Sequence, residues 1–319
     1  MALSKIQTNS ITDGNITTAK IADTAVHGYR NLLVNGGLIV SQRGDYTSAT
    51  SYSGETYYLD RWKMWQASVS GTVQQTTVTI NGVTKKAMKI VATSSATGFI
   101  GTRQKIELQN IPVGVNLVAS CWVRSNNAYT RFRYNDFGGS DANSPVFTND
   151  GNWEKVSFSI DSSSTTVNPS IGLITYDTGM VSVTSGDYIE FTDFQLEISS
   201  GSPTPFEHRS YGDELRRCQR YCTVLNSPSN LFMYRDYYST DTMVTNADLP
   251  VTMRTTPSIT MTGSGGTSNT GFTYINLGAE PTLAALSPQA IAVYRGVASS
   301  ARTYIHMAST GELTMEAEL

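Results

Sequence analysis

The chain has few of the residues that build disulfides, metal sites and most enzyme active sites. Its 319 residues include three cysteines and three histidines. Cys121, Cys218 and Cys222 are too few for a disulfide framework at this length, and we interpret them as packed thiols. The histidines lie in separate segments, and none has a metal-motif spacing such as H-x-x-x-H. The sequence therefore locates no metal site and predicts no cofactor.

Charge and long apolar runs are scarce as well. Charged residues are 15% of the chain, against about 25% in a usual soluble domain. The net charge of −3 provides no basic field, so no nucleic-acid partner is expected. No apolar run approaches the roughly 20 residues of a membrane span, and the start MALSKIQTNS has no apolar core of a secretory signal. We expect no membrane insertion, and assembly in a cytoplasm with release by lysis.

The abundant residues, Ser, Thr, Asn and Gly, separate short β-rich runs. Asn81-Gly82 stands between two such runs, and an Asn-Gly pair in this position is the strongest short-range sequence signal for a β-hairpin. In another run Ser120 and Trp122 share one face while Cys121 takes the other, so both faces are expected to be partly covered. The further runs recur at the spacing of an all-β sandwich, at 98–108, 116–125, 130–135, 154–161, 171–177 and 187–198.

A break in the β pattern predicts a domain boundary near residue 210. The segment SSGSPTPFEHRSYGDE contains Pro203 and Pro205, which cannot donate ladder hydrogen bonds. The next stretch, DELRRCQRYCTVL, predicts a short helix over about 212–225, because four residues fall at helical spacing: Leu215, Cys218, Cys222 and Leu225. After it the runs are again β-like. We therefore expect residues 211–319 to form a second, C-terminal β-sandwich domain preceded by this helix.

The N-terminal segment has a large apolar residue at every fifth position: Ile6, Ile11, Ile16, Ile21 and Val26. A step of five scatters side chains around a helix and alternates them across a strand. The residues between them favour bends. We interpret residues 1–30 as an extended oligomerisation segment whose apolar rows meet on sister chains, since so few residues cannot form a core alone. The alternative is a flexible polar leader.

Several stretches together resemble bacteriophage tail-fibre and receptor-binding proteins. They are RNLLVNGGLIVSQRG with YYLDRW, FQLEISSGSPTPFEHRSYGDELRRCQRYC, the final GELTMEAEL, and the repeats of SITDGNITTAKIADTAV. The resemblance covers residues 5–225 well and the last hundred loosely. It implies a jelly-roll module akin to carbohydrate-binding domains over 31–210, and a homotrimer that attaches to tail or baseplate proteins through residues 1–30. It also allows a structural calcium ion, whose ligands the sequence does not locate.

Five residues are expected to hold this module together. Asp60, Arg61 and Trp62 place a charge pair beside a large ring at a strand start, which suits an anchor in which Arg61 meets a carboxylate and Trp62 packs inward. The resemblance implies that Phe206 and Glu207 form the last edge of the sandwich, pinned back to its beginning. We treat all five as structural residues and not as a site.

Tyrosines supply the candidate glycan contacts. The stretch YRDYYS combines aromatic rings with polar partners in Tyr234, Arg235, Asp236, Tyr237 and Tyr238. Sugars stack apolar C–H faces on rings, and their hydroxyls bind polar side chains. The alternative is that these tyrosines only cover a sheet face.

The sequence offers weak evidence for catalysis. Asp187 and Asp193 share strand parity and Glu190 has the opposite parity, so a glycosidase pair could lie there, but solvated strand carboxylates are the simpler interpretation. We therefore expect a non-enzymatic structural subunit of a phage tail fibre, located in the virion, that mediates host recognition and adsorption through weak multivalent contacts to surface glycan. The alternatives are a fibre-borne polysaccharide depolymerase and a purely structural tail connector.

Overall fold

The computed structural model describes residues 30–111, 115–135, 141–161, 167–199, 201–226, 236–239, 242–262, 272–275, 282–296, 304–307 and 312–319. The apolar residues of the N-terminal repeat, Ile6, Ile11, Ile16, Ile21 and Val26, lie outside the described residues, so their role in oligomerisation stays a prediction. The regular structure that is described consists of strands, one α-helix and one short 3-10 helix at Leu108–Asn110. The expectation of an all-β chain is confirmed.

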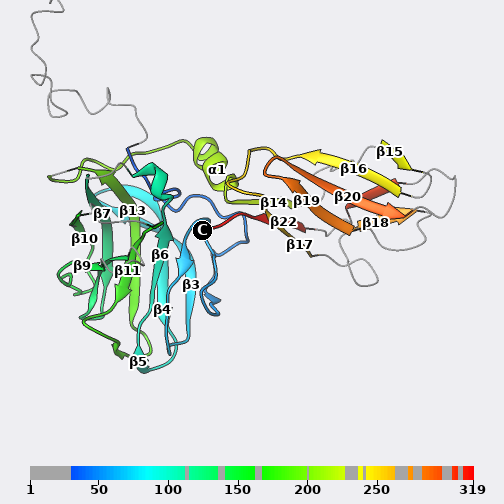
Figure 1. Ribbon diagram of the computed structural model, residues 1–319. Coiled ribbons are helices and arrows are strands. Elements are labelled where there is room, and N and C mark those ends of the chain that lie inside the picture. Colours follow the sequence, from blue (N-terminus) through cyan, green and yellow to red (C-terminus); the bar gives the residue numbers. More distant parts are fainter. Residues whose placement is uncertain are drawn as a thin grey trace, which may run out of the picture.

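The N-terminal part of the described chain is a sandwich of two antiparallel sheets (Figure 1). The first sheet has the order β1 (Thr50–Ser51), β3 (Gly71–Ile80), β4 (Val83–Ala92), β13 (Tyr188–Ile198), β7 (Asn116–Ser125) and β10 (Glu154–Asp161). The second has the order β2 (Lys63–Met64), β6 (Gly101–Lys105), β11 (Ser170–Thr175), β8 (Thr130–Asn135) and β9 (Ala142–Asn143). A small ribbon pairs β12 (Val181–Val183) with β5 (Ala96–Gly98). Between β6 and β13 the chain crosses repeatedly from one sheet to the other, as in a jelly roll.

Local sequence explains the first long hairpin. Asn81 and Gly82 both have positive φ, 51° and 79°, which a two-residue turn of the primed type requires. The register runs from Ile80 opposite Val83 along the whole of β3 and β4. This turn lies where the sequence predicts it.

The core of the sandwich is centred on Trp62. Its side chain is fully buried, and its indole N–H donates to the Asn35 carbonyl at 2.9 Å. The ring centroid lies 5.1 Å from that of Phe191 and 5.2 Å from that of Phe194. Phe132 from the second sheet packs against Phe194 at 5.4 Å. Aromatic side chains from both sheets therefore meet around one ring.

A bulge in β13 changes which side chains face outward. The pairing with β7 shifts between Thr192 and Gln195, and Asp193 takes a left-handed φ of 51°. Before the bulge Phe191 faces the core, and after it Phe194 does. The parity argument therefore fails here: the bulge places Asp193 on the outer face together with Glu190, and Asp187 precedes the strand.

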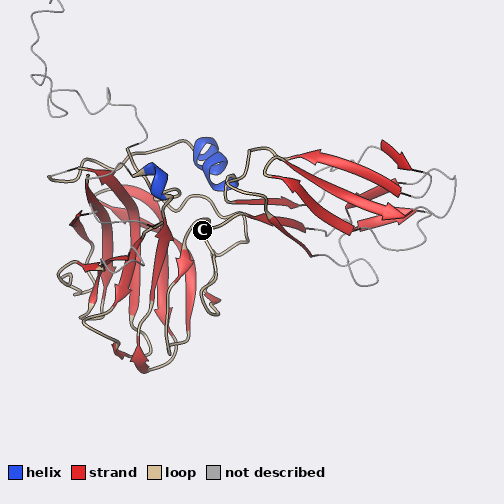
Figure 2. Ribbon diagram, in the orientation of Figure 1, coloured by secondary structure: helices blue, strands red, loops and turns tan. Residues whose placement is uncertain are grey.

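The C-terminal part consists of three further sheets beyond helix α1 (Tyr211–Gln219) (Figures 1 and 2). One sheet has the order β14 (Cys222–Asn226), β22 (Glu312–Glu316) and β17 (Ser258–Thr262). A second has the order β15 (Asp236–Ser239), β16 (Thr242–Asp248), β20 (Ala290–Gly296) and β19 (Thr282–Ser287). The last pairs β18 (Phe272–Ile275) with β21 (Tyr304–Met307). In Figure 1 these sheets extend away from the sandwich, while α1 and the chain's last residues lie between the two parts.

Helix α1 ends earlier than the helical spacing suggests. It begins at the cap residue Ser210, whose hydroxyl accepts from the Asp213 N–H at 3.2 Å, and it ends at Gln219 rather than near residue 225. Cys222 and Leu225 lie instead on β14, paired with Glu316 and Leu313 of β22. The β-branched residues that follow Cys222 favour a strand once a partner strand is available, and this partner comes from the far end of the sequence.

All three cysteines are free and buried. Burial raises the pKa of Cys121 and Cys218 well above the usual value and raises the pKa of Cys222 to about 12. Only a thiolate attacks a disulfide reagent, so we expect the native protein to react negligibly with Ellman's reagent at pH 8. In denaturant, three cysteines per chain should react. Rapid modification of the native chain would contradict the described packing.

The junction between the two parts is held by charged hydrogen bonds. Glu107 accepts from the Tyr221 hydroxyl at 2.7 Å and from Arg220 at 3.1 Å. Arg43 pairs with Glu316 at 3.2 Å and with Glu318 at 3.0 Å. The last residues of the chain therefore contact the N-terminal sandwich.

Acid should weaken this junction. Burial opposes the charge of Glu107, but hydrogen bonds from Tyr221 and Arg220 outweigh it and lower the pKa of this carboxyl. A lowered folded-state pKa stabilises the protein above the unfolded value of about 4.5, and this contribution is lost as the pH falls through the folded value. We expect Glu107→Gln to cost about 1 kcal/mol at pH 7 and much less at pH 3. Thermal unfolding of both proteins at the two pH values tests this, and an equal penalty at both would contradict it.

Candidate functional site

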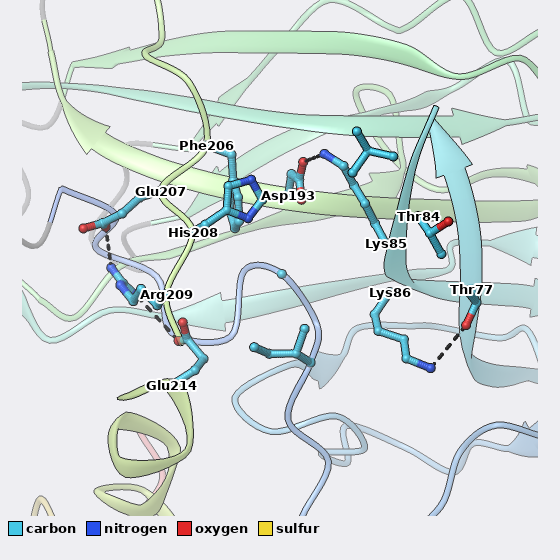
Figure 3. Close-up of a pocket in the computed structure, with 13 residues that line it drawn as sticks. Thr77, Thr84, Lys85, Lys86, Asp193, Phe206, Glu207, His208, Arg209 and Glu214 are labelled. Atoms are coloured by element: carbon cyan, nitrogen blue, oxygen red, sulfur yellow. Dashed lines mark hydrogen bonds and ion pairs between the residues drawn. The ribbon is translucent and has the colours of Figure 1, made fainter. Parts of the chain in front are cut away.

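A groove crosses the outer face of the six-stranded sheet. It consists of two adjoining cavities of about 360 Å³ and 300 Å³. Both are lined by Lys85 of β4, Asp193 of β13, and Phe206 and His208 from the segment that follows β13. We call this depression the sheet-face groove. Figure 3 shows Phe206 and His208 beside the Lys85–Asp193 ion pair in the larger cavity.

Strand register explains how these side chains meet. Trp122 of β7 stands opposite Thr192 of β13 and Lys155 of β10. Trp122 and Lys155 line the smaller cavity together with Ser120, which also points outward from β7. The indole of Trp122 is only half-buried. An aromatic ring in the middle of a sheet face, next to hydroxyl and ammonium groups, is a surface for ligands that have both apolar and polar sides.

The next row of the same face is charged and aromatic. Glu190 stands opposite Lys89 on one side and Arg124 on the other. The Arg124 guanidinium lies 5.0 Å from the centre of the Trp153 ring, and the Lys89 ammonium lies 5.1 Å from that of Tyr188. Both rings are half-buried. Cation–π contacts thus hold these two rings on the same outer face of the sheet.

Two carboxylates of this face, Glu190 and Asp193, are engaged by cations. Glu190 is 1% exposed and accepts from Arg124 Nε at 2.8 Å and from the Thr76 hydroxyl at 2.6 Å. Asp193 is paired with the Lys85 ammonium. The left-handed backbone at Asp193 aims its carboxylate toward β4, a conformation that Asp tolerates better than most residues. Glu190 and Asp193 are therefore fixed in position by ion pairs within the sheet.

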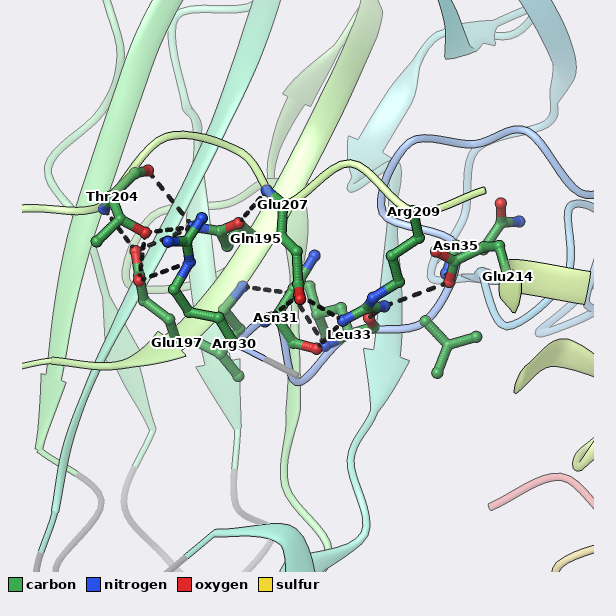
Figure 4. A network of polar contacts seen from close by, with 12 residues as sticks. Arg30, Asn31, Leu33, Asn35, Gln195, Glu197, Thr204, Glu207, Arg209 and Glu214 are labelled. Carbon is green, nitrogen blue, oxygen red and sulfur yellow. Dashed lines mark hydrogen bonds and ion pairs between the residues drawn. The ribbon is translucent and has the colours of Figure 1, made fainter. Parts of the chain in front are cut away.

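One wall of the groove is the segment 203–209, which we call the strap. Glu207 holds it in two ways: its N–H donates to Gln195 Oε1, and its carboxylate accepts from the Asn31 N–H, both at 2.8 Å. Arg209 donates to the Asn31 carbonyl and, at 3.0 Å, to the Leu33 carbonyl. Figure 4 shows this network joining the strap to the first described residues. The strap therefore keeps a defined position although it forms no strand.

A second set of contacts fixes the start of the strap. The buried Glu197 accepts from the Thr204 N–H at 2.7 Å and from its hydroxyl at 2.6 Å. Arg30 donates to the Pro205 carbonyl at 2.8 Å. The ring of Phe206 meets that of His208 edge-on at 5.0 Å. Buried polar groups thus hold the part of the strap that carries Phe206 and His208 in position.

The structure divides the five predicted structural residues between two places. Phe206 and Glu207 lie in the strap, beside the groove. Asp60, Arg61 and Trp62 lie near the junction, where Asp60 accepts from the Gln42 N–H at 2.6 Å. Arg61 pairs with Glu318, and its guanidinium stacks 3.6 Å from the centre of the Tyr221 ring. The carboxylate that Arg61 meets therefore belongs to the C-terminal part of the chain.

None of the predicted glycan contacts is among the residues that line this groove. Tyr234 and Arg235 lie outside the described residues. Asp236, Tyr237 and Tyr238 belong to β15, and their side chains also lie outside what the structure describes. Sequence reasoning missed Trp122 and Lys85 as site residues. Their outward parity was readable, but their neighbours depend on strand pairings across more than a hundred residues.

The described residues contain neither a candidate metal cluster nor a candidate membrane-spanning helix. No group of three or more His, Cys, Asp or Glu there could hold a metal ion. None of the helices in that part of the chain has the length and apolar character to cross a membrane.

Comparison with known proteins gives structural neighbours only. No protein-family model and no curated protein matches the chain. TmCBM61, solved with β-1,4-galactotriose, is 18% identical over 53% of this chain and 99% of its own, with a TM-score of 0.32. A family 11 carbohydrate-binding module from Clostridium thermocellum is 15% identical over 46% and 94%, with a TM-score of 0.29. The enzymatically active domain of bacteriophage CBA120 tailspike protein 4 is 12% identical over 54% and 22%, with a TM-score of 0.35. The structural neighbours are thus carbohydrate-binding modules and a phage tailspike domain, at low identity.

Proposed function

We propose that this chain is a non-enzymatic glycan-binding protein and that the sheet-face groove holds the saccharide. The observation that supports this most is the partly exposed indole of Trp122, on the outer face of an interior strand and beside Ser120 and Lys155. A sugar ring has an apolar C–H face that stacks on an aromatic ring, and hydroxyls that need polar partners. Trp122 and Phe206 supply the rings, while Lys85 and Asp193 supply the polar groups.

The ion pairs of the groove favour binding over cleavage. A glycosidase needs one carboxyl that keeps its proton and a second that is free to act as base or nucleophile. Glu190 is held by Arg124 and Asp193 by Lys85, so neither carboxylate is free to act as a base or nucleophile.

Incubation of the purified chain with bacterial surface polysaccharide separates binding from cleavage. We expect the polysaccharide to retard the chain in affinity electrophoresis and expect no new reducing ends. The appearance of reducing ends would establish the depolymerase alternative. Failure to bind any polysaccharide from a panel would favour the structural connector.

We further propose that the chain is a subunit of a phage tail fibre in the virion and acts in host adsorption. The segments that resemble such fibre proteins support this, as does the apolar repeat of residues 1–30, which suits a homotrimeric stalk attached to tail or baseplate proteins. A shallow groove gives a weak single contact. Linking three copies raises the apparent affinity by roughly 10²–10⁴ when all sites can bind together.

Removal of residues 1–29, which keeps Arg30 and its hydrogen bond to the strap, tests this division of roles. The truncated chain should lose the trimer, keep its single-site glycan affinity, and fail to join particles. The measurements are native mass, calorimetric titration with an oligosaccharide, and incorporation in a phage assembly extract. A truncated chain that still enters particles would contradict the proposed role of the segment.

A further inference from the structure

A second cavity, separate from the groove, lies beside α1. It has a volume of about 500 Å³, within the range of small-molecule sites. Its walls come from three parts of the chain: Leu32 and Val34 near the start of the sandwich, Arg216 and Arg217 on α1, and Val251 before β17. Asn110, Tyr221 and Arg220 complete it. We call it the helix-side cavity.

Helical spacing gathers the cations on this side. Positions 213, 216, 217 and 220 lie on one face of a helix, while Glu214 and Cys218 point to the buried side. Arg216, Arg217 and Arg220 therefore all line one cavity. They are the only cations among its lining residues, and Asp213 is the only acid.

The acids nearby are already engaged. The Asp213 carboxylate accepts from the Ser210 hydroxyl at 2.6 Å at the helix start. Glu107, outside the cavity, binds Arg220 and Tyr221. Arg216 is exposed and forms no ion pair with any residue in the described part of the chain. The cavity therefore carries more positive than negative charge.

We propose that the helix-side cavity binds the carboxylate or phosphate of an acidic sugar. The guanidinium fork matches both anions with paired hydrogen bonds. Leu32, Val34 and Val251 form an aliphatic wall suited to the C–H face of a sugar ring. Arginines near a helix C-terminus also interact well with the helix dipole. The dipole explains why the charges are positive, but it does not explain the aliphatic wall that two separate segments build in the same cavity.

The experiment titrates the full chain by calorimetry with three probes: trigalacturonate, glucose 6-phosphate and neutral galactotriose. The first two separate a carboxylate from a phosphate as the preferred anion. We expect an acidic probe to bind, with an affinity that falls as salt rises. The double variant Arg216→Gln/Arg217→Gln should weaken this binding at least tenfold. The matched double variant Lys63→Gln/Lys105→Gln, which removes the same charge at residues that line neither the groove nor the helix-side cavity, should change it less than twofold.

Several results would overturn this proposal. They are the absence of binding for both acidic probes, equal losses in the two double variants, or a changed native mass in the arginine variant, which would mark a contact between copies of the chain. Trp122→Ala separates the two sites. If it abolishes binding of the acidic probe and the arginine variant does not, the acid binds in the groove and the helix-side site is wrong. If the acidic probe binds in an arginine-dependent way but no saccharide binds in the groove, the helix-side site stands and the proposed function fails.

Discussion

Replacement of Trp62 by alanine is expected to destabilise the protein by about 3–5 kcal/mol, the usual range for a buried aromatic residue. The side chain is fully buried, and it packs against Phe191 and Phe194 while its N–H binds the Asn35 carbonyl. Truncation would leave both a large cavity and an unpaired backbone oxygen.

Urea unfolding followed by circular dichroism measures this loss. Trp153→Ala is the matched control, because that ring is half-buried at the edge of the outer face and should cost about 1 kcal/mol or less. Equal losses in the two variants would show that Trp62 does not occupy the centre of the core.

The second large effect is expected on ligand binding. Trp122→Ala should weaken single-site binding of a glycan about tenfold or more, which corresponds to at least ~1.4 kcal/mol for the removed stacking surface. The loss should be larger for the proposed homotrimer, because each of its linked sites is weakened. Stability should change little, since the ring is half-exposed on the outer face.

Tyr129→Ala is the control for this variant. Tyr129 is 40% exposed in the turn between β7 and β8 and does not line the groove. Calorimetric titration of the two variants against the same oligosaccharide compares them directly. Equal affinities of the wild type and Trp122→Ala for the oligosaccharide would show that the groove is not the binding site.

Local signals predicted much of this fold. The Asn81-Gly82 turn, the alternation in β7 and the inward position of Trp62 each depend on residues close together in the chain. The end of α1 could not be predicted in this way, because β14 forms only by pairing with β22, at the other end of the sequence. The bulge at Asp193 also escaped a parity argument, since one inserted residue reverses the outward face without any compositional sign.

The groove was harder to predict than the fold. Its residues come from β4, β7, β13 and the strap, and only the register between these elements brings Lys85, Trp122 and Phe206 together. The tyrosine-rich stretch attracted attention because its rings are consecutive in the sequence. A sheet instead gathers rings from different strands, and single-sequence reasoning has no access to those pairings.

The most direct test of the account uses the indole N–H signals of the four tryptophans in a ¹⁵N-labelled protein. Titration with an oligosaccharide that the chain binds should shift the Trp122 signal strongly and that of Trp153, which lines neither cavity of the groove, more weakly. The signal of the buried Trp62 should stay in place. Saturable binding that leaves the Trp122 signal unchanged would contradict a saccharide site on this sheet face.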